Sequence, residues 1–403
     1  MKDTIIKDLA TEKLIDASKS GCIENIKVLI DDGADVNVVN RAGLSPLVVA
    51  VRRGHLNIVN ALLELGADSN IHDIGKRVGT PLIQAIRQRI PKLVRRLLQA
   101  GAHVDLSNYC GQTALMEAVD CEDPSLVMIL LSAGATVNLQ DQNGRTALFK
   151  ASTNVSITRL LVDAKANLNI QDKEGRTALI ESSFRGNVDV VKCLLHSVEE
   201  GEEADVDIRD NDGKTALMNA CVSYIGSAAV VKTLLEAGAN VDAQDTLGET
   251  SLMMAIERKH EDIIRLLLDA GASIDIQDNI CCKTALMTAC ELRCLNFVKL
   301  LLKHGANLLI KDNTGRTAMH YAFLNKNCDE TFIPLIKILI QSDPNIFQLN
   351  NTRSLPWKLV SKEMKNQIFN IWIKWWVIYH SNIDLQQLRE HGFDAWRHCV
   401  EFL

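Results

Sequence analysis

Four cysteines close together in the sequence are the residues whose type and spacing could do chemistry. Cys281 and Cys282 are adjacent, and Cys290 and Cys294 lie one helical turn apart. Thiolates bind zinc, but they must converge on one ion at about 2.3 Å, and adjacent cysteines rarely supply two ligands to it. We therefore expect free thiols at these positions. Whether the four cysteines have any further role stays open at this stage.

A second candidate is the stretch IRDNDGKT, which contains residue types found in phosphate loops and in calcium loops. A phosphate loop needs a glycine five residues before Gly213, and a calcium loop needs an acid there, but the residue is Ile208. The motifs G-x-S-x-G and H-E-x-x-H and the glycine-rich dinucleotide loop are missing from the sequence. The sequence thus predicts no catalytic residues, no metal site and no cofactor, and a protein that is not an enzyme.

Composition narrows the class of protein further. The chain has 403 residues, of which 47% are hydrophobic and 4% aromatic, and its formal net charge is -6. Few aromatic residues among many aliphatic ones favour small layered helices over one thick core, and the net charge disfavours wholesale nucleic-acid binding. The irregularly spaced cysteines give no disulfide framework. Without an apolar leader or a long apolar segment, we expect a soluble protein of the cytoplasm, with the nucleus as the alternative.

The elements that would position any binding residues come from an internal repeat. A phrase such as GQTALMEA or GRTALFKA recurs, and a second phrase such as LLSAGATVN follows each copy. The steps between copies run from 31 residues (Thr146 to Thr177) to 38 residues (Thr177 to Thr215). The threonine or serine of each phrase can cap a helix, and Pro46 fits a first helical turn. Such a unit cannot bury its leucines alone, so the units must stack.

This pattern resembles the ankyrin-repeat family over roughly residues 11–345. The resemblance implies an all-α solenoid of helix-turn-helix units with short hairpin fingers. We expect an N-terminal capping unit at 1–40, about nine repeats at 41–345 and a Trp-rich helical segment at 346–403.

Several units depart from the family pattern. The family tetrapeptide TPLH survives only as TAMH at residues 317–320. The fourth repeat is short around residues 152–156, and the finger DNICCK has an extra residue and lacks the turn glycine. An acidic insertion at residues 196–209 suits a mobile loop. We expect the fold to hold in the repeats that lack the TPLH histidine, and we expect an irregular tip at the finger DNICCK.

The tail allows more than one interpretation. It contains all five tryptophans, and the simplest interpretation is a helical cap over the last repeat. A second is a loose likeness to the F-box or the SOCS box, a helical segment that docks a ubiquitin-ligase adaptor. Leu355, Pro356, Leu359 and Ile368 would be the docking residues, although their spacing is too long for an F-box and the acid after Leu-Pro is missing. A membrane-surface helix is the least favoured, because the segment has no clear basic face.

The resemblance to ankyrin repeats also implies where a partner would bind, since ankyrin repeats generally use a concave row of finger tips and first helices. Between Arg41 and Arg96 there are ten Lys or Arg residues and three acids. By register, the row contains Arg41, Arg52, Arg53, Lys76, Arg77, Arg87, Arg89, Tyr109, Gln112, Arg145, Arg176 and Lys214.

Such a row would attract an acidic or phosphorylated segment of a protein. A solvated charged face is the alternative, and nucleic acid is disfavoured because stacking aromatics are scarce. The sequence thus predicts a monomeric scaffold or adaptor that binds a protein partner. A ubiquitin-ligase substrate receptor and a nucleic-acid binder remain the alternatives.

Overall fold

The computed structural model describes most of the repeat region of the chain. The described residues are 12–40, 43–71, 79–196, 203–223, 226–324, 330–343, 367–368 and 371. The chain divides into two compact units, Met1–Asn211 and Asp212–Leu403, and each unit is described here by itself.

Helices alternate with short loops throughout both units, and the only β pairing among the described residues is two isolated bridges, one of them between Ser107 and Thr113. In the first unit, a helix at residues 12–20 precedes α2 (Ile23–Asp31), α3 (Pro46–Arg53), α4 (Leu56–Glu64), α5 (Pro81–Arg87), α6 (Pro91–Gln99), α7 (Ala114–Asp120), α8 (Pro124–Ser132), α9 (Ala147–Lys150), α10 (Val155–Asp163), α11 (Ala178–Phe184) and α12 (Val188–His196). The second unit contains α13 (Ala216–Val222), α14 (Ala228–Glu236), α15 (Ser251–Arg258), α16 (Glu261–Asp269), α17 (Ala285–Glu291), α18 (Leu295–Lys303), α19 (Ala318–Leu324) and α20 (Phe332–Ser342).

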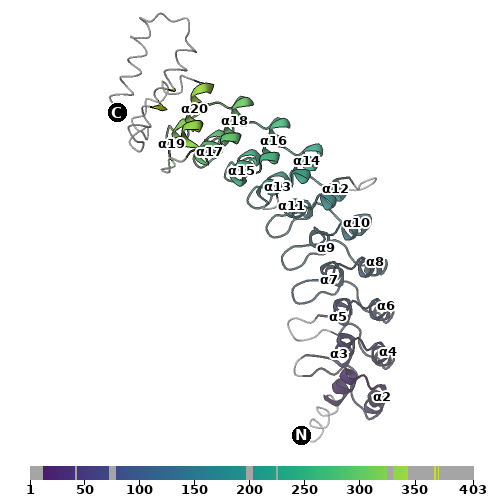
Figure 1. The fold of residues 1–403 in the computed structure, drawn as a ribbon. Coiled ribbons are helices and arrows are strands. Elements are labelled where there is room, and N and C mark those ends of the chain that lie inside the picture. The colour runs from purple at the N-terminus through teal and green to yellow at the C-terminus, as the bar shows by residue number, and fades with distance from the viewer. Residues whose placement is uncertain are drawn as a thin grey trace, which may run out of the picture. The chain divides into compact units, whose positions relative to one another are not determined.

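Within each unit the helices form two layers. The first helix of each pair packs on the first helix of the next pair, as α3 does on α5, and the second helices form the other layer. The loops that precede the first helices project as fingers on the side of those helices (Figure 1). This is the all-α repeat solenoid that the sequence predicts.

Each first helix begins where its capping residue stands. The side chain of Ser45 accepts the backbone N–H of Val48 at 3.2 Å, and the side chain of Thr146 accepts that of Phe149 at 3.2 Å. A cap of this kind contributes about 1 kcal/mol to helix stability. Pro46 occupies the first helical turn, where its missing N–H costs nothing. The capping role that the repeated phrase predicts is therefore confirmed.

The second helices contain pairs of adjacent leucines, and only one leucine of a pair is fully buried between repeats. Leu62 is fully buried while the neighbouring Leu63 is only partly so, and in α16 Leu267 is the fully buried member. Because successive helical residues lie about 100° apart, one face can bury only one of the two completely.

Backbone hydrogen bonds join successive fingers from the finger of Cys110 onward. The N–H of Gln142 donates to the carbonyl of Cys110 at 2.9 Å, and that of Lys173 donates to the carbonyl of Asn143 at 2.9 Å. Gly144, with φ +77°, brings the fingers this close, because a Cβ atom on it would lie 3.0 Å from the nitrogen of Lys173. The turn glycine therefore serves both the turn and the contact between repeats.

This double role predicts a specific mutational contrast. Gly134 also has a positive φ, +84°, but nothing lies within 4 Å of where its Cβ atom would stand. Both Gly144→Ala and Gly134→Ala should lose about 1 kcal/mol of unfolding free energy to the backbone conformation. Only Gly144→Ala should lose more, since its methyl group pushes the neighbouring finger away. Urea denaturation of both variants measures the difference, and equal losses would contradict the close-approach argument.

The irregular units fold for identifiable reasons. In TAMH, His320 Nδ1 accepts the backbone N–H of Thr317 at 3.0 Å, which is the contact the other repeats lose. In the preceding repeat the sulfur of Met287 takes the N–H of Thr284 at 3.4 Å instead. The short fourth repeat has only four residues in its first helix, α9. In the finger DNICCK, Cys282 takes the left-handed conformation (φ 58°) that glycine takes elsewhere.

His320 makes the last described repeat sensitive to acid. Burial, and then the nearby charge of Arg316, lower the pKa of His320 below its usual value of 6.5. A histidine with a lowered pKa in the folded state binds its proton more tightly when unfolded. The free energy of unfolding should therefore fall as the pH drops below about 6.5, and this loss should be absent at pH 8.

The variant His320→Gln should flatten this dependence, because the amide does not titrate. Urea unfolding at pH 8.0 and 5.5, followed by far-UV circular dichroism, compares the two proteins. An equal loss of stability in both would assign the acid sensitivity to other groups.

Candidate functional site

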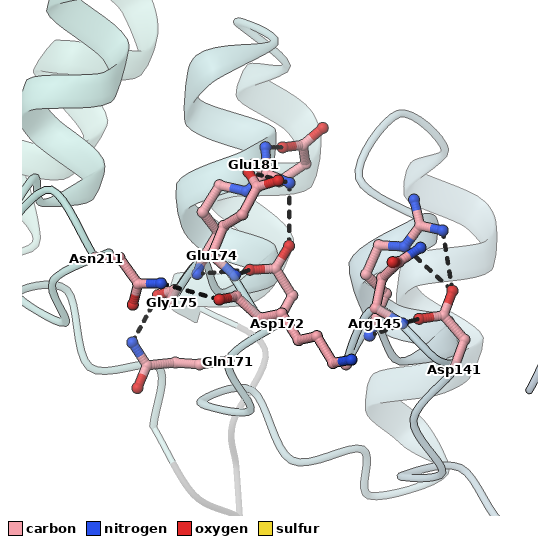
Figure 2. A network of polar contacts seen from close by, with 12 residues as sticks. Asp141, Arg145, Gln171, Asp172, Glu174, Gly175, Glu181 and Asn211 are labelled. Carbon is pink, nitrogen blue, oxygen red and sulfur yellow. Dashed lines mark hydrogen bonds and ion pairs between the residues drawn. The ribbon is translucent and has the colours of Figure 1, made fainter.

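In the fingers that precede α9 and α11, a buried aspartate closes the turn from within. Oδ1 of Asp141 accepts the backbone N–H groups of Asn143 at 2.8 Å and of Arg145 at 3.0 Å. Its Oδ2 accepts from Nε of the Arg145 side chain at 3.1 Å. Burial opposes the ionised form of Asp141, but these hydrogen bonds outweigh it, so its pKa is lowered. The finger therefore contains an ion pair between two residues of the same loop, as Figure 2 shows for Asp141 and Arg145.

The next finger extends this arrangement to a first helix. Arg176 pairs with Asp172 at 3.0 Å and with Glu181 of α11 at 3.2 Å. Glu181 also binds Arg185 at 2.7 Å, and Figure 2 shows Glu181 above Asp172. Burial works against the charge of Arg176, yet its carboxylate partners raise its pKa above the usual value. The charge of Arg176 is thus largely compensated inside the protein.

Two further members of the predicted row are also compensated. Nε and Nη2 of Arg87 donate to the carboxylate of Glu117 at 2.8 and 2.9 Å, which joins α5 to α7. The side chain of Lys214 stands 3.8 Å from Asp212 in the second unit. Arg145, Arg176, Arg87 and Lys214 therefore lie on the predicted surface but do not present a free charge there.

Three arginines of the row are exposed and have no carboxylate within ion-pair distance among the described residues, although the charge of Arg89 is near enough to Asp123 to help lower the pKa of that carboxyl. Arg52 and Arg53 end α3, and Arg89 follows α5 in a left-handed turn (φ 54°). Within the part of the chain that the structure describes, none of the three forms an ion pair. Since α3 packs on α5, their side chains belong to successive repeats of one layer. The charge that can meet a partner is therefore concentrated on these three residues.

The other predicted residues divide between exposed and undescribed positions. Tyr109 is 65% exposed at its finger tip, whereas Gln112 bonds Asp120 through its amide at 3.3 Å. Arg41, Lys76, Arg77 and the proposed docking residues Leu355, Pro356 and Leu359 lie outside the described residues. Ile368 is described, and it is buried.

The second unit contains a finger that the sequence analysis missed. We call the residue before each capping threonine the pre-cap position; its occupants include Gln112, Arg145 and Arg176 in the first unit and Lys214, Glu249, Lys283 and Arg316 in the second. At Glu249 an acid replaces the usual base, directly beside the finger aspartate Asp245. This reversal was visible in the aligned phrases as GETS in place of GRTA. It could have been found from the register alone.

The cysteines of the described residues are free thiols. Among the described residues, no three His, Cys, Asp or Glu side chains converge as a metal site would require. Cys281 and Cys282 lie partly buried in their finger, and Cys290 is fully buried in α17. Burial also raises the pKa of Cys221 to about 12, which keeps it a thiol at neutral pH.

Among the described helices, none is long and apolar enough to cross a membrane.

Known proteins resemble this chain along its repeats. An E3 ubiquitin-protein ligase of Arabidopsis thaliana, the putative ligase XBAT35, is 34% identical over 96 residues, 24% of this chain and 21% of the relative. The B-cell lymphoma 3 protein homolog of Mus musculus is 36% identical over 101 residues, 25% and 22% of the two chains. The ankyrin repeat and KH domain-containing protein mask-1 of Caenorhabditis elegans is 34% identical over 99 residues, 25% and 4%.

Each of these matches spans about a fifth or less of the relative's own length, so it reflects the repeats alone. The family described as ankyrin repeats (3 copies) matches residues 14–108, 72–141, 115–203, 198–278 and 252–348. Ankyrin repeats are a protein-protein interaction module, generally without catalytic activity. Capped first helices, glycine-turned fingers and this match together establish that the chain belongs to the ankyrin-repeat family.

Proposed function

We propose that this protein is a non-enzymatic scaffold or adaptor that binds a protein partner on its finger face. By finger face we mean the finger tips together with the exposed ends of the first helices. In the first unit, Arg52, Arg53 and Arg89 bind an acidic or phosphorylated segment of that partner. Arginine suits this task because its guanidinium can donate two parallel hydrogen bonds to a carboxylate or a phosphate.

The observation that carries the proposal is the contrast between two groups of arginines. Arg87, Arg145 and Arg176 sit in their own carboxylate pairs, whereas Arg52, Arg53 and Arg89 form no ion pair within the described part of the chain. Three like charges on one layer repel one another, and a ligand of opposite charge would relieve that repulsion. Their exposure favours a ligand of opposite charge.

The two alternatives have less support. A ligase-adaptor function depends on a tail segment whose residues Leu355, Pro356 and Leu359 lie outside the described residues. The ligases among the relatives match over the repeats only, so their names concern the repeat module. For nucleic acid, Tyr109 is the one exposed aromatic residue of the predicted row, and stacking surfaces need several.

The charge-reversed triple variant Arg52→Glu, Arg53→Glu, Arg89→Glu tests the proposal. Its matched control, Lys92→Glu, Arg95→Glu, Lys192→Glu, changes the same charge on exposed positions of the second helices α6 and α12. Nuclease-treated lysate is passed over each immobilised protein, and captured proteins are quantified by mass spectrometry. The finger-face variant should lose its main partner about tenfold or more, as one charge-assisted pair is worth about 1.4 kcal/mol or more.

The control should retain that partner, and both variants should keep the melting temperature of the parent chain within about 2 °C, as surface substitutions usually do. Equal capture by the parent and by both variants would overturn the proposed role of the finger face. Capture of the partner by all three proteins from untreated lysate, but by none of them from nuclease-treated lysate, would instead indicate a nucleic-acid bridge.

A further inference from the structure

The finger of Asp245 lacks the internal cation that closes its counterparts. Oδ1 of Asp245 accepts the backbone N–H groups of Leu247 and Glu249, each at 2.9 Å, as the finger register requires. Its Oδ2 is buried and has no hydrogen-bond partner, and the whole residue is only 6% exposed. In the fingers of Asp141 and Asp172 the corresponding oxygen accepts from an arginine at the pre-cap position. By the same register, the Asp245 oxygen is directed toward the side chain of Glu249.

An orphaned carboxylate oxygen beside a second acid is energetically unfavourable. A buried carboxylate oxygen without a hydrogen-bond donor is unfavourable, and a like charge nearby adds to this cost. The pKa of Glu249 is raised, first by burial and then by the charges of Glu257, Asp245 and Asp278, while Lys214 opposes the rise. Four carboxylates thus contribute negative potential at one point of the finger face.

The neighbouring lysines are engaged elsewhere. The ammonium group of Lys283 binds Glu291 at 2.9 Å and lies 5.0 Å from the centre of the Tyr321 ring. Lys214 has Asp212 at 3.8 Å. Neither forms an ion pair with Glu249 in the part of the chain that the structure describes. Glu249 therefore has no ion pair among the described residues, and the charge of Lys214 compensates this negative site only in part.

Two exposed aliphatic side chains border the site. Leu247 is 44% exposed and Ile280 is 59% exposed, and both stand at finger tips. Their fingers are joined by the hydrogen bond from the N–H of Asn279 to the carbonyl of Leu247 at 2.8 Å. An apolar rim beside a buried charge is typical of sites that take an amphipathic side chain, since its stem packs on the rim while its head meets the charge.

We propose that the Asp245–Glu249 site binds an arginine side chain of a protein partner, with aliphatic residues of that segment packed on Leu247 and Ile280. The inference rests on the proposed function, because it names a second contact of the same kind of surface. The guanidinium would complete the finger from outside, as Arg145 completes the finger of Asp141 from inside. Because this finger has no internal arginine, the free energy of the arginine–carboxylate pair would stabilise the complex with the partner and not the fold.

The chain itself indicates arginine over other cations. Arg145 and Arg176 each bond a finger aspartate, whereas Lys283 turns away from Asp278 to Glu291. A metal ion would need three or more converging ligands, and the described residues offer no such group. A guanidinium needs only two acceptor oxygens in one plane.

The first test concerns stability, and it compares the same substitution in two fingers. Asp245→Asn keeps the Oδ1 acceptor and removes the orphaned charge, and its new amide can donate to Glu249, as the amide of Asn108 donates to Gln112 at 3.0 Å. Asp172→Asn removes one of the carboxylate partners of Arg176. Differential scanning calorimetry should show an unchanged or raised melting temperature for Asp245→Asn and a fall of a few degrees for Asp172→Asn. Equal falls would mean that Asp245 is compensated within the fold, and the inference would fail.

The second test measures binding to the full chain. The probe is the peptide acetyl-Gly-Leu-Arg-Leu-Gly-amide, and its control carries citrulline, the neutral isostere, in place of arginine. Isothermal titration calorimetry should detect the arginine peptide and show at least about tenfold weaker binding of the citrulline peptide, the loss expected for one charge-assisted pair. Equal affinity for both peptides would overturn the proposal.

Glu249→Arg is the decisive variant, since it restores the internal pair of the Arg145 finger. It should keep or raise the melting temperature and weaken the arginine peptide by about tenfold or more. Its matched control is Glu236→Arg, the same charge change on the exposed side of α14, where Glu236 only pairs with Lys232 at 3.8 Å. Retained binding in Glu249→Arg, or equal loss in both variants, would refute the site.

The two proposals fail separately in these experiments. The triple variant of Arg52, Arg53 and Arg89 should bind the arginine peptide like the parent chain, because its substitutions lie in the other unit. If the peptide does not bind while capture through those arginines persists, the Asp245–Glu249 inference is wrong and the scaffold function stands. If the peptide binds while no protein is captured on the finger face, the scaffold function is wrong.

Discussion

The hydrogen bond between the backbones of successive fingers is the constraint on which the rest of the structure depends. It requires a glycine, or in one finger a cysteine, to take a positive φ at each tip. It also fixes the register, because the finger aspartate and the pre-cap residue must then stand at the same place in every regular unit. Asp141 and Arg145, Asp172 and Arg176, and Asp245 and Glu249 are therefore equivalent positions.

Comparison of these equivalent positions separates the residues that hold the turn together from the residues that set the charge of the finger. A side-chain oxygen acceptor is needed at the aspartate position, because the Oδ1 atom holds two backbone N–H groups of the turn, as Asp141 and Asn108 both do. The residue at the pre-cap position decides what happens to the second oxygen. An arginine there closes the finger, and Glu249 leaves it open. The same scaffold can thus present a neutral or a negative finger without any change in its backbone.

The repeat, its caps and its glycine turns could all be predicted from the sequence, because each depends on residues within one unit. The Thr146 cap and the short fourth repeat are examples. The available charge could not be predicted in the same way. Arg87 has the same character in the sequence as Arg89, yet only Arg87 meets an acid, Glu117, thirty residues further on. The open finger of Asp245 was not predicted for a different reason. The predicted binding row was defined by its basic residues, and Glu249 is an acid.

The pairing of aspartate and arginine inside one finger has a consequence for how such chains grow. A repeat copied next to itself would carry both members of the pair, so the new unit would arrive electrically balanced and would join its neighbours through the same backbone contacts. A pair such as Arg87 and Glu117, which bridges two units, would be divided by the same event. Charge balance is thus kept within one unit at Asp141 and Arg145 and shared between two units at Arg87 and Glu117, so a duplicated unit keeps the first pair and leaves one copy of Arg87 without its acid.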